Sequence, residues 1–198
     1  DCLLSRGLGD VYKRQLHTLN IRLFADQIVY IANHAEDEVI FVDRSLMALL
    51  WPLVDQLETV RHLIVMDDGD GEVPDDPRVL DYEELLSSAS PVNFEVKDEK
   101  QAASMCYTSG TTGNPKGVVY SHRSTYMHTI TTMTADGLGV CESDVILPVV
   151  PMFHVNSWGL QHAAVAAGAT LVNPGPKLQP EPIAELMESE KVTISCCR

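Results

Sequence analysis

Short, uninterrupted apolar runs alternate with helical patterns along most of the chain, and this alternation limits the fold more than any other feature. The strand-length runs cover residues 38–43, 62–66, 102–107, 145–150 and 170–172. The helical patterns cover residues 24–35, 46–57, 121–134, 156–167 and 180–190. We expect Ser45 to cap the second helix, and Pro182 stands in the first turn of the last. Strands that are apolar throughout are typical of parallel sheets covered by helices, so the predicted class is α/β.

The charge balance disfavours two classes of partner. The chain has 198 residues, of which 28 are acidic and 14 basic, and its formal net charge is −14. Nucleic-acid binding needs Lys and Arg in excess to neutralise phosphates, so we expect no nucleic-acid partner. Adhesion to an anionic membrane is disfavoured for the same reason. The longest apolar stretches, residues 145–153 and 163–172, are about half as long as a membrane-spanning helix, so we expect no transmembrane segment.

The acidic excess is concentrated in one segment. Twelve acidic residues and three basic residues lie between Met66 and Lys100. Their spacing does not match an EF-hand calcium loop, and a solvated surface segment is the simpler interpretation. The five cysteines include no Cys-X-X-Cys pair and no zinc spacing. This pattern is unlike a secreted disulfide framework, and it favours a reducing cytoplasm.

Both ends of the sequence fit the alternating pattern poorly. Residues 1–15 follow neither a helical nor a strand period, and Gly7 and Gly9 interrupt both. The last four residues, 195–198, come directly after a strand-like run at residues 192–194. We expect a non-native or irregular leader over residues 1–15, a partial domain over residues 16–194, and a non-native end over residues 195–198. The alternative is a real but irregular tail.

The segment from Tyr107 to Gly117 has the composition of a phosphate-binding loop. Its three glycines let backbone amides approach a ligand, and Lys116 adds a positive charge. Four hydroxyl groups can donate to phosphate oxygens, those of Thr108, Ser109, Thr111 and Thr112. The loop follows a predicted strand and precedes a predicted helix, where α/β sheets bind nucleotides. It is not a Walker A loop, because Gly117 follows the lysine. The alternative is a flexible turn without a ligand.

Three segments resemble the adenylate-forming superfamily, the AMP-binding enzymes that include acyl-CoA synthetases and luciferases. The string Tyr-Thr-Ser-Gly-Thr-Thr-Gly-Asn-Pro-Lys-Gly, at residues 107–117, meets every position of the family's phosphate-binding signature. Residues 147–159 resemble the next core motif in its long- and medium-chain synthetase form. Residues 16–23 resemble an upstream segment, with Ile21 where Pro is commoner. The resemblance implies a truncated part of the large N-terminal domain, with mixed and parallel sheets flanked by helices, so that residues 16–194 form a partial AMP-binding domain.

The resemblance also implies roles for individual residues. Lys116 and Thr108 are the candidate catalytic residues, and Thr108 also matches a hydroxyl near Mg²⁺. The residues that match the ATP phosphate-binding positions are Thr108, Ser109, Gly110, Thr111, Thr112, Gly113 and Lys116. His154 and Val155 match positions of the adenylate and acyl pocket, and Trp158 matches a tryptophan that gates the acyl tunnel. The alternatives are a structural role for His154 and core packing for Trp158.

The implied activity is that of an ATP-dependent fatty acyl-CoA synthetase, with ATP, Mg²⁺ and CoA as cofactors or co-substrates and a fatty acid or other carboxylate as substrate. The family's later motifs, including the adenine-binding segment and the distal lysine, do not occur here, so we expect this chain alone to be inactive. A homodimer is expected for the complete protein. Three alternatives stay open: a ligase for a short or sulfur-containing carboxylate, a non-catalytic nucleotide-binding truncation, and a degenerate gene piece.

Overall fold

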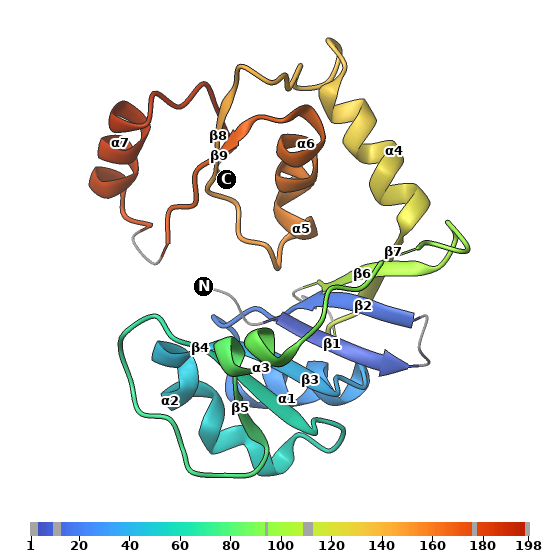
Figure 1. Ribbon diagram of the computed structural model, residues 1–198, viewed down its shortest axis with the longest axis vertical. Helices are drawn as coiled ribbons and strands as arrows, with labels where there is room; N and C mark the ends of the chain where they lie inside the picture. The colour runs from blue at the N-terminus through green and yellow to red at the C-terminus, as the bar shows by residue number, and fades with distance from the viewer. Residues whose placement is uncertain (1–3, 10–12, 94, 109–112, 176–177, 197–198) are drawn as a thin grey trace. The chain divides into compact units, whose positions relative to one another are not determined.

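The computed structural model describes residues 4–9, 13–93, 95–108, 113–175 and 178–196. They form two compact units, residues 1–121 and 122–198 (Figure 1). Among these described residues, no helix is long and apolar enough to cross a lipid bilayer.

The first unit is built on a mixed sheet. Its strands are β1 (Leu4–Gly9), β2 (Lys13–Thr18), β3 (Val39–Asp43), β4 (His62–Met66), β5 (Val79–Asp81), β6 (Ala102–Tyr107) and β7 (Gly117–Ser121). Its helices are α1 (Ala25–His34), α2 (Met47–Leu50) and α3 (Tyr82–Ser88), with 3-10 turns η1 (Arg44–Leu46) and η2 (Trp51–Gln56). The strand order is β5-β4-β3-β1-β2-β6-β7. The pairs β3–β4, β4–β5 and β2–β6 are parallel as expected, whereas β1 and β7 pair antiparallel with their neighbours.

Side chains of β3 point alternately to the two faces of this sheet, and helices cover both faces. Successive side chains of a strand point to opposite faces. Ile40 and Val42 are fully buried in one cluster with residues of α1, α2 and β4. Phe41 points the other way, and its ring meets that of Tyr82 in α3 with centroids 6.3 Å apart. Each fully buried side chain of this kind contributes about 1.5–3 kcal/mol, so this core is the main stabilising term of the unit.

The helix predicted over residues 46–57 forms as three short pieces, η1, α2 and η2. Pro52 lacks the amide proton that a continuous α-helix needs at that position, which accounts for the break. The predicted cap is also wrong, because Asp43 occupies the N-cap position of the first turn. Ser45 instead donates its hydroxyl and its amide to the carboxylate of Asp68 in the following loop.

Part of the expected leader, residues 4–9, pairs with the sheet as β1. The backbone of β1 pairs antiparallel with β2 over the whole strand, from Leu4 opposite Thr18 to Gly9 opposite Lys13. Backbone pairing satisfies the amides and carbonyls of a strand whatever the period of its side chains.

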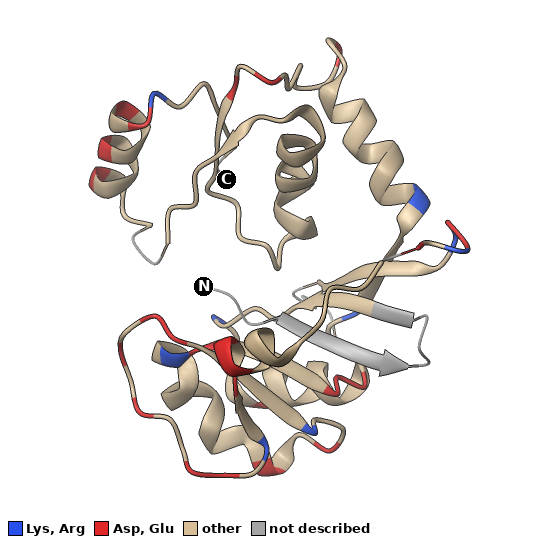
Figure 2. Ribbon diagram, in the orientation of Figure 1, with Lys and Arg blue, Asp and Glu red and all other residues tan. Residues whose placement is uncertain are grey.

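The acidic segment lies on the surface of the first unit. Figure 2 shows its Asp and Glu residues along the loop between β4 and β5 and at the start of α3. The guanidinium of Arg78 binds both oxygens of Asp76, and these hydrogen bonds lower the pKa of that carboxyl to about 2. Within the described part of the chain, no three His, Cys, Asp or Glu side chains are placed to hold a metal ion.

The second unit contains a three-stranded parallel sheet in the order β10-β8-β9. Its elements are α4 (His122–Met133), β8 (Val145–Pro148), α5 (Val155–Trp158), α6 (Leu160–Ala167), β9 (Thr170–Leu171), α7 (Pro180–Ser189) and β10 (Ile194–Cys196). Ala163 and Ala164 of α6 are fully buried against Ile146 of β8. Ser195 and Cys196, which belong to the predicted non-native end, lie in β10, where Ser195 pairs with Leu147. The last strand therefore begins two residues later than the predicted run.

Candidate active site

The two ends of the candidate phosphate loop are fastened together by backbone and hydroxyl groups. Tyr107 at the end of β6 pairs with Gly117 at the start of β7. The amide of Thr108 donates to the carbonyl of Lys116 at 3.0 Å, and the amide of Lys116 donates to the hydroxyl of Thr108 at 3.3 Å. The two candidate catalytic residues thus stand side by side at the base of the loop.

The loop joins two antiparallel strands, so that strand β7 lies between the loop and the predicted helix. Val118, Val119 and Tyr120 have high strand propensity and continue the sheet as β7. The helix predicted over residues 121–134 forms as α4, from His122 to Met133.

The described loop residues leave a cation available to a ligand. Thr108, Gly113 and Lys116 are exposed, while Pro115 is buried. Lys116 makes no ion pair with any described residue. An unpaired ammonium in a chain of net charge −14 favours an anionic ligand. Ser109, Gly110, Thr111 and Thr112, the other predicted phosphate ligands, lie outside the described residues.

The second candidate motif forms a left-handed turn instead of the first turn of the predicted helix 156–167. Val155, Asn156, Ser157 and Trp158 all have φ between 50° and 55°. Such backbone costs about 1–3 kcal/mol per residue and persists only where the surroundings hold it. The buried hydroxyl of Ser157 donates to the carbonyl of Val150 at 2.7 Å. Regular helix begins at Leu160, after Gly159 at φ +70°.

His128 of α4 closes this turn from outside the motif. Its Nε2 lies 2.9 Å from the carbonyl oxygen of Trp158. Since a carbonyl only accepts, Nε2 is the donor. A Cβ added to Gly159 would lie 2.5 Å from Cδ2 of the same imidazole. His128 therefore requires glycine at position 159, a relation that the sequence motif did not indicate.

The turn and α4 line a pocket of about 500 Å³ within the second unit. Its lining residues are His128, Thr131, Thr132, Gly137, Leu138, Val155 and Trp158. The structure thus brings together two of the three predicted acyl-pocket residues, Val155 and Trp158. Trp158 is 40% exposed, so its ring lies at the pocket and not in the core. His154, the third, is half-buried and does not line this pocket. The apolar side chains suit an apolar ligand.

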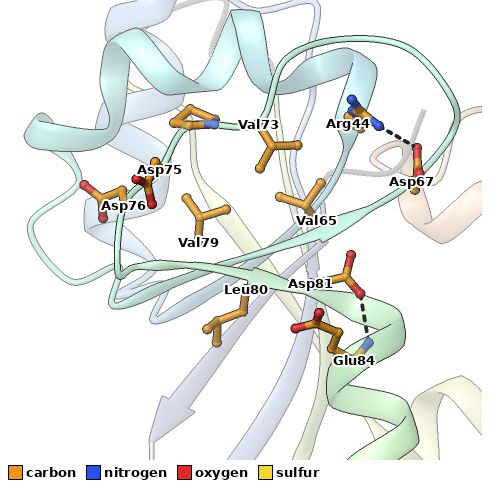
Figure 3. A pocket seen from close by; sticks show the side chains of 11 residues that line it. Arg44, Val65, Asp67, Val73, Asp75, Asp76, Val79, Leu80, Asp81 and Glu84 are labelled. Carbon is orange, nitrogen blue, oxygen red and sulfur yellow. Dashed lines mark hydrogen bonds and ion pairs between the residues drawn. The ribbon is translucent and has the colours of Figure 1, made fainter.

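Another pocket, of about 280 Å³, lies in the first unit under the acidic loop (Figure 3). Its polar groups are used within the protein. Arg44 pairs with Asp67 at 3.4 Å, and Asp81 accepts the amide of Glu84 at 2.8 Å as the N-cap of α3. These contacts give the pocket a structural role.

Two further histidines lie in helices of the second unit. His122 begins α4 and is half-buried. His162 in α6 is also half-buried, and its Nδ1 is enclosed without a hydrogen-bond partner among the described atoms. Burial, and then the charge of His128, lower the pKa of His162 below its ordinary value.

The comparisons with known proteins agree with this arrangement. The family model described as AMP-binding enzyme matches residues 15–197. The chain therefore belongs to the family of AMP-binding enzymes, and the α/β fold is that of the N-terminal part of adenylate-forming enzymes.

The names of the similar proteins give different substrates. The chain is 46% identical over 190 residues to a long-chain-fatty-acid–CoA ligase of Thermus thermophilus, covering 96% of this chain and 33% of that protein. It is 44% identical over 181 residues to a 3-methylmercaptopropionyl-CoA ligase of Ruegeria lacuscaerulensis, covering 90% and 34%. A solved long-chain-fatty-acid-CoA ligase from Archaeoglobus fulgidus superposes with a TM-score of 0.75 at 27% identity, covering 90% and 34%. The chain thus spans about a third of the length of these relatives.

Proposed function

We propose that this chain is part of an ATP-dependent acyl-CoA ligase and supplies its phosphate loop and part of its acyl pocket. The observation that carries the proposal is the closed base of the loop, where Thr108 and Lys116 bond to each other while the ammonium of Lys116 stays exposed. The membership of the chain in the AMP-binding family supports it.

The reaction has two steps. A carboxylate oxygen attacks the α-phosphorus of ATP, the bond to the β-phosphate oxygen breaks, and pyrophosphate leaves. The sulfur of CoA then attacks the acyl carbon, the bond to AMP breaks, and the thiol loses its proton. In the first step, charge grows on the departing pyrophosphate, where Lys116 and the loop hydroxyls are proposed to stabilise it.

A Mg²⁺ ion fits this proposal, with one described protein oxygen as a ligand and the remaining ligands from water and phosphate. Magnesium binds oxygen atoms and usually keeps several waters together with substrate phosphates. Thr108 offers one exposed hydroxyl oxygen, which also accepts the amide of Lys116. Bound there, the ion would neutralise charge on the phosphate oxygens.

The substrate proposed is a fatty acid, because apolar side chains line the pocket at Val155, Trp158 and Leu138. A short or sulfur-containing carboxylate is the second candidate, and the Ruegeria relative supports it. Identities of 44% and 46% do not separate the two. CoA as acyl acceptor, a homodimer of the complete protein and a cytoplasmic location remain predictions of the same proposal.

The loop role is tested by titrating the chain with Mg-ATP in a calorimeter. Lys116→Ala should weaken binding at least about tenfold, because it removes a charge-assisted contact with phosphate. The free energy of unfolding should hardly change, since the side chain is exposed. Lys100→Ala, at an exposed lysine of the same unit, is the matched control. Equal affinities of the two variants for Mg-ATP would show that Lys116 is not part of the phosphate site. If the parent chain and both variants fail to bind Mg-ATP, the proposed role of the loop is wrong.

A further inference from the structure

Four polar residues, two of them buried, form a cluster at Tyr107, the residue that precedes the phosphate loop residue Thr108. We call His17, Asp37, His34 and Tyr107 the His17 cluster. His17 of β2 and Asp37 are 1% and 0% exposed. The Nδ1 atom of His17 lies 3.0 and 2.9 Å from the two carboxylate oxygens of Asp37, so this nitrogen donates to the carboxylate.

The cluster holds the ring of Tyr107 from several sides. The centroids of the His17 and Tyr107 rings are 5.2 Å apart. Nδ1 of His34 lies 2.7 Å from the Tyr107 hydroxyl. Burial is the main cause that raises the pKa of Tyr107 to about 12, so this hydroxyl keeps its proton at neutral pH. On the remaining side, a Cβ at Gly117 would lie 3.2 Å from Cζ of the tyrosine.

The strand register explains why these residues meet. His17 pairs with Met105 across β2 and β6, and Tyr107 follows Met105 by two positions on the same face of β6. Tyr107 is also the last residue of β6, and the next residue is Thr108. A shift of the tyrosine ring would therefore move the hydrogen bonds that close the loop between Thr108 and Lys116.

A contribution to folding stability does not by itself explain why the buried pair of His17 and Asp37 is present. Burying a charged or polar pair costs desolvation, and apolar residues of similar volume often serve as well. In addition, Nε2 of His17 is enclosed without a hydrogen-bond partner in the described part of the chain. A hydrogen-bonded polar network in the interior can rigidify the groups around it, which offers this cluster a use other than packing.

We propose that His17, Asp37 and His34 are positioning residues of the phosphate loop. They fix the ring of Tyr107, and through it they hold Thr108 and Lys116 in the arrangement that accepts phosphates. The inference rests on the proposed function in that the loop is taken to bind ATP.

Amide hydrogen exchange tests the positioning role without using ATP. The reporter is the amide of Thr108, whose bond to Lys116 opens whenever the loop base opens. His17→Gln keeps a donor for Asp37 and removes the ring that packs on Tyr107. We expect the amide of Thr108 to exchange about tenfold faster, because loss of the ring lets the base of the loop open more often. Such local opening does not require the whole unit to unfold. His34→Ala, at an exposed residue, tests the contact with the hydroxyl and should accelerate the exchange about threefold.

Ile40→Val is the matched control, since Ile40 is fully buried in the core cluster against which Tyr107 also packs but is not part of the His17 cluster. It should speed the slowest amides of β3 and β4 and change Thr108 exchange less than His17→Gln does. If Thr108 responds to His17→Gln and His34→Ala no more than to Ile40→Val, the positioning role is wrong. Should His17→Gln fail to fold, the His34→Ala comparison decides alone.

A Mg-ATP titration of the same proteins separates this inference from the proposed function. Weaker binding by His17→Gln, in step with faster Thr108 exchange, supports both. If the parent chain binds no Mg-ATP while the exchange pattern appears as expected, the proposed function fails and the positioning of the loop base stands. Faster exchange with unchanged affinity would overturn the claim that the cluster sets the phosphate-accepting geometry.

Discussion

Two glycines of the second unit share a left-handed backbone and differ in their surroundings. Gly159 has φ +70° and Gly139 has φ +65°. A Cβ at Gly159 would meet the ring of His128, whereas nothing lies within 4 Å of a Cβ at Gly139. Comparing the two positions therefore separates backbone strain from steric contact.

Gly159→Ala should lower the free energy of unfolding by about 3 kcal/mol, and Gly139→Ala by about 1 kcal/mol. The difference arises because only the first substitution displaces His128 from the carbonyl of Trp158. Urea denaturation of both variants provides the measurement. Equal losses would show that the contact with His128 does not hold the turn.

Trp158 is the residue whose substitution should change specificity. Trp158→Ala enlarges a pocket that the indole lines, so a full-length protein containing this chain should shift its preference among carboxylates toward longer or bulkier acyl chains. The stability cost should be small, since the side chain is 40% exposed. Initial rates with carboxylates of rising chain length, for the parent and the variant, give the answer. An unchanged preference would assign Trp158 to the wall of a pocket that does not receive the acyl chain.

At the residue scale, the sequence predicted those residues that lie within short motifs. Thr108, Lys116, Val155 and Trp158 were proposed as site residues because their neighbours form a recognisable string. His17 and His128 could not, because their partners lie 20 and 30 positions away along the chain. Only the strand register and the packing of α4 bring those partners together, and neither has a local signal.

At the scale of elements, helix α6 contains a titratable group that should make the second unit sensitive to pH. The pKa of His162 is lowered below its ordinary value of 6.5 by burial and by His128. Below pH 6.5 the unfolded chain takes up a proton on this residue that the folded chain does not. The contribution of His162 to stability is therefore fully present above pH 6.5 and is lost as the pH falls toward its folded pKa.

We expect the free energy of unfolding to fall between about pH 7.5 and about pH 5.5, and we expect His162→Gln to reduce that fall. Fluorescence of Trp158 in a Trp51→Phe background follows the second unit alone. His62→Gln, at an exposed histidine of the first unit, is the control and should keep the parent's pH dependence. A pH profile that His162→Gln leaves unaltered would mean that other groups cause the loss.

The elements that the sequence failed to predict each have a physical cause. β7 was not predicted, because it is a short strand that directly follows the glycine- and hydroxyl-rich loop. β5 and α3 lie in the acidic segment. Because that segment contains many aspartates, Asp81 did not stand out as the N-cap of α3. The helix over residues 156–167 was predicted four residues too long, because positive φ values at Val155 to Trp158 leave no trace in hydrophobic spacing.

For the whole molecule, the α/β class and strands β3, β4, β6, β8 and β9 followed from the alternating pattern, but the sheet order did not. The pattern predicted parallel strands, and it gave no reason for β1 to lie antiparallel between β2 and β3. Pairing between distant strands depends on contacts that no local period encodes. The division into two units was likewise not predicted.

The size of the chain sets a limit on its chemistry. It spans about a third of the length of its ligase relatives. Positioning of reactants accounts for roughly 7–11 kcal/mol of a barrier, and the family's other positioning motifs are not in this sequence. The chain alone should therefore bind phosphates without turning over.

Carboxylate-dependent exchange of labelled pyrophosphate into ATP tests the central claim most directly. In a full-length protein containing this chain, the account predicts exchange that requires a carboxylate and falls at least about a hundredfold in Lys116→Ala. The 198 residues alone should give no exchange. Exchange that proceeds without a carboxylate, or that Lys116→Ala leaves intact, would contradict the assignment of the Thr108 to Lys116 loop to adenylation.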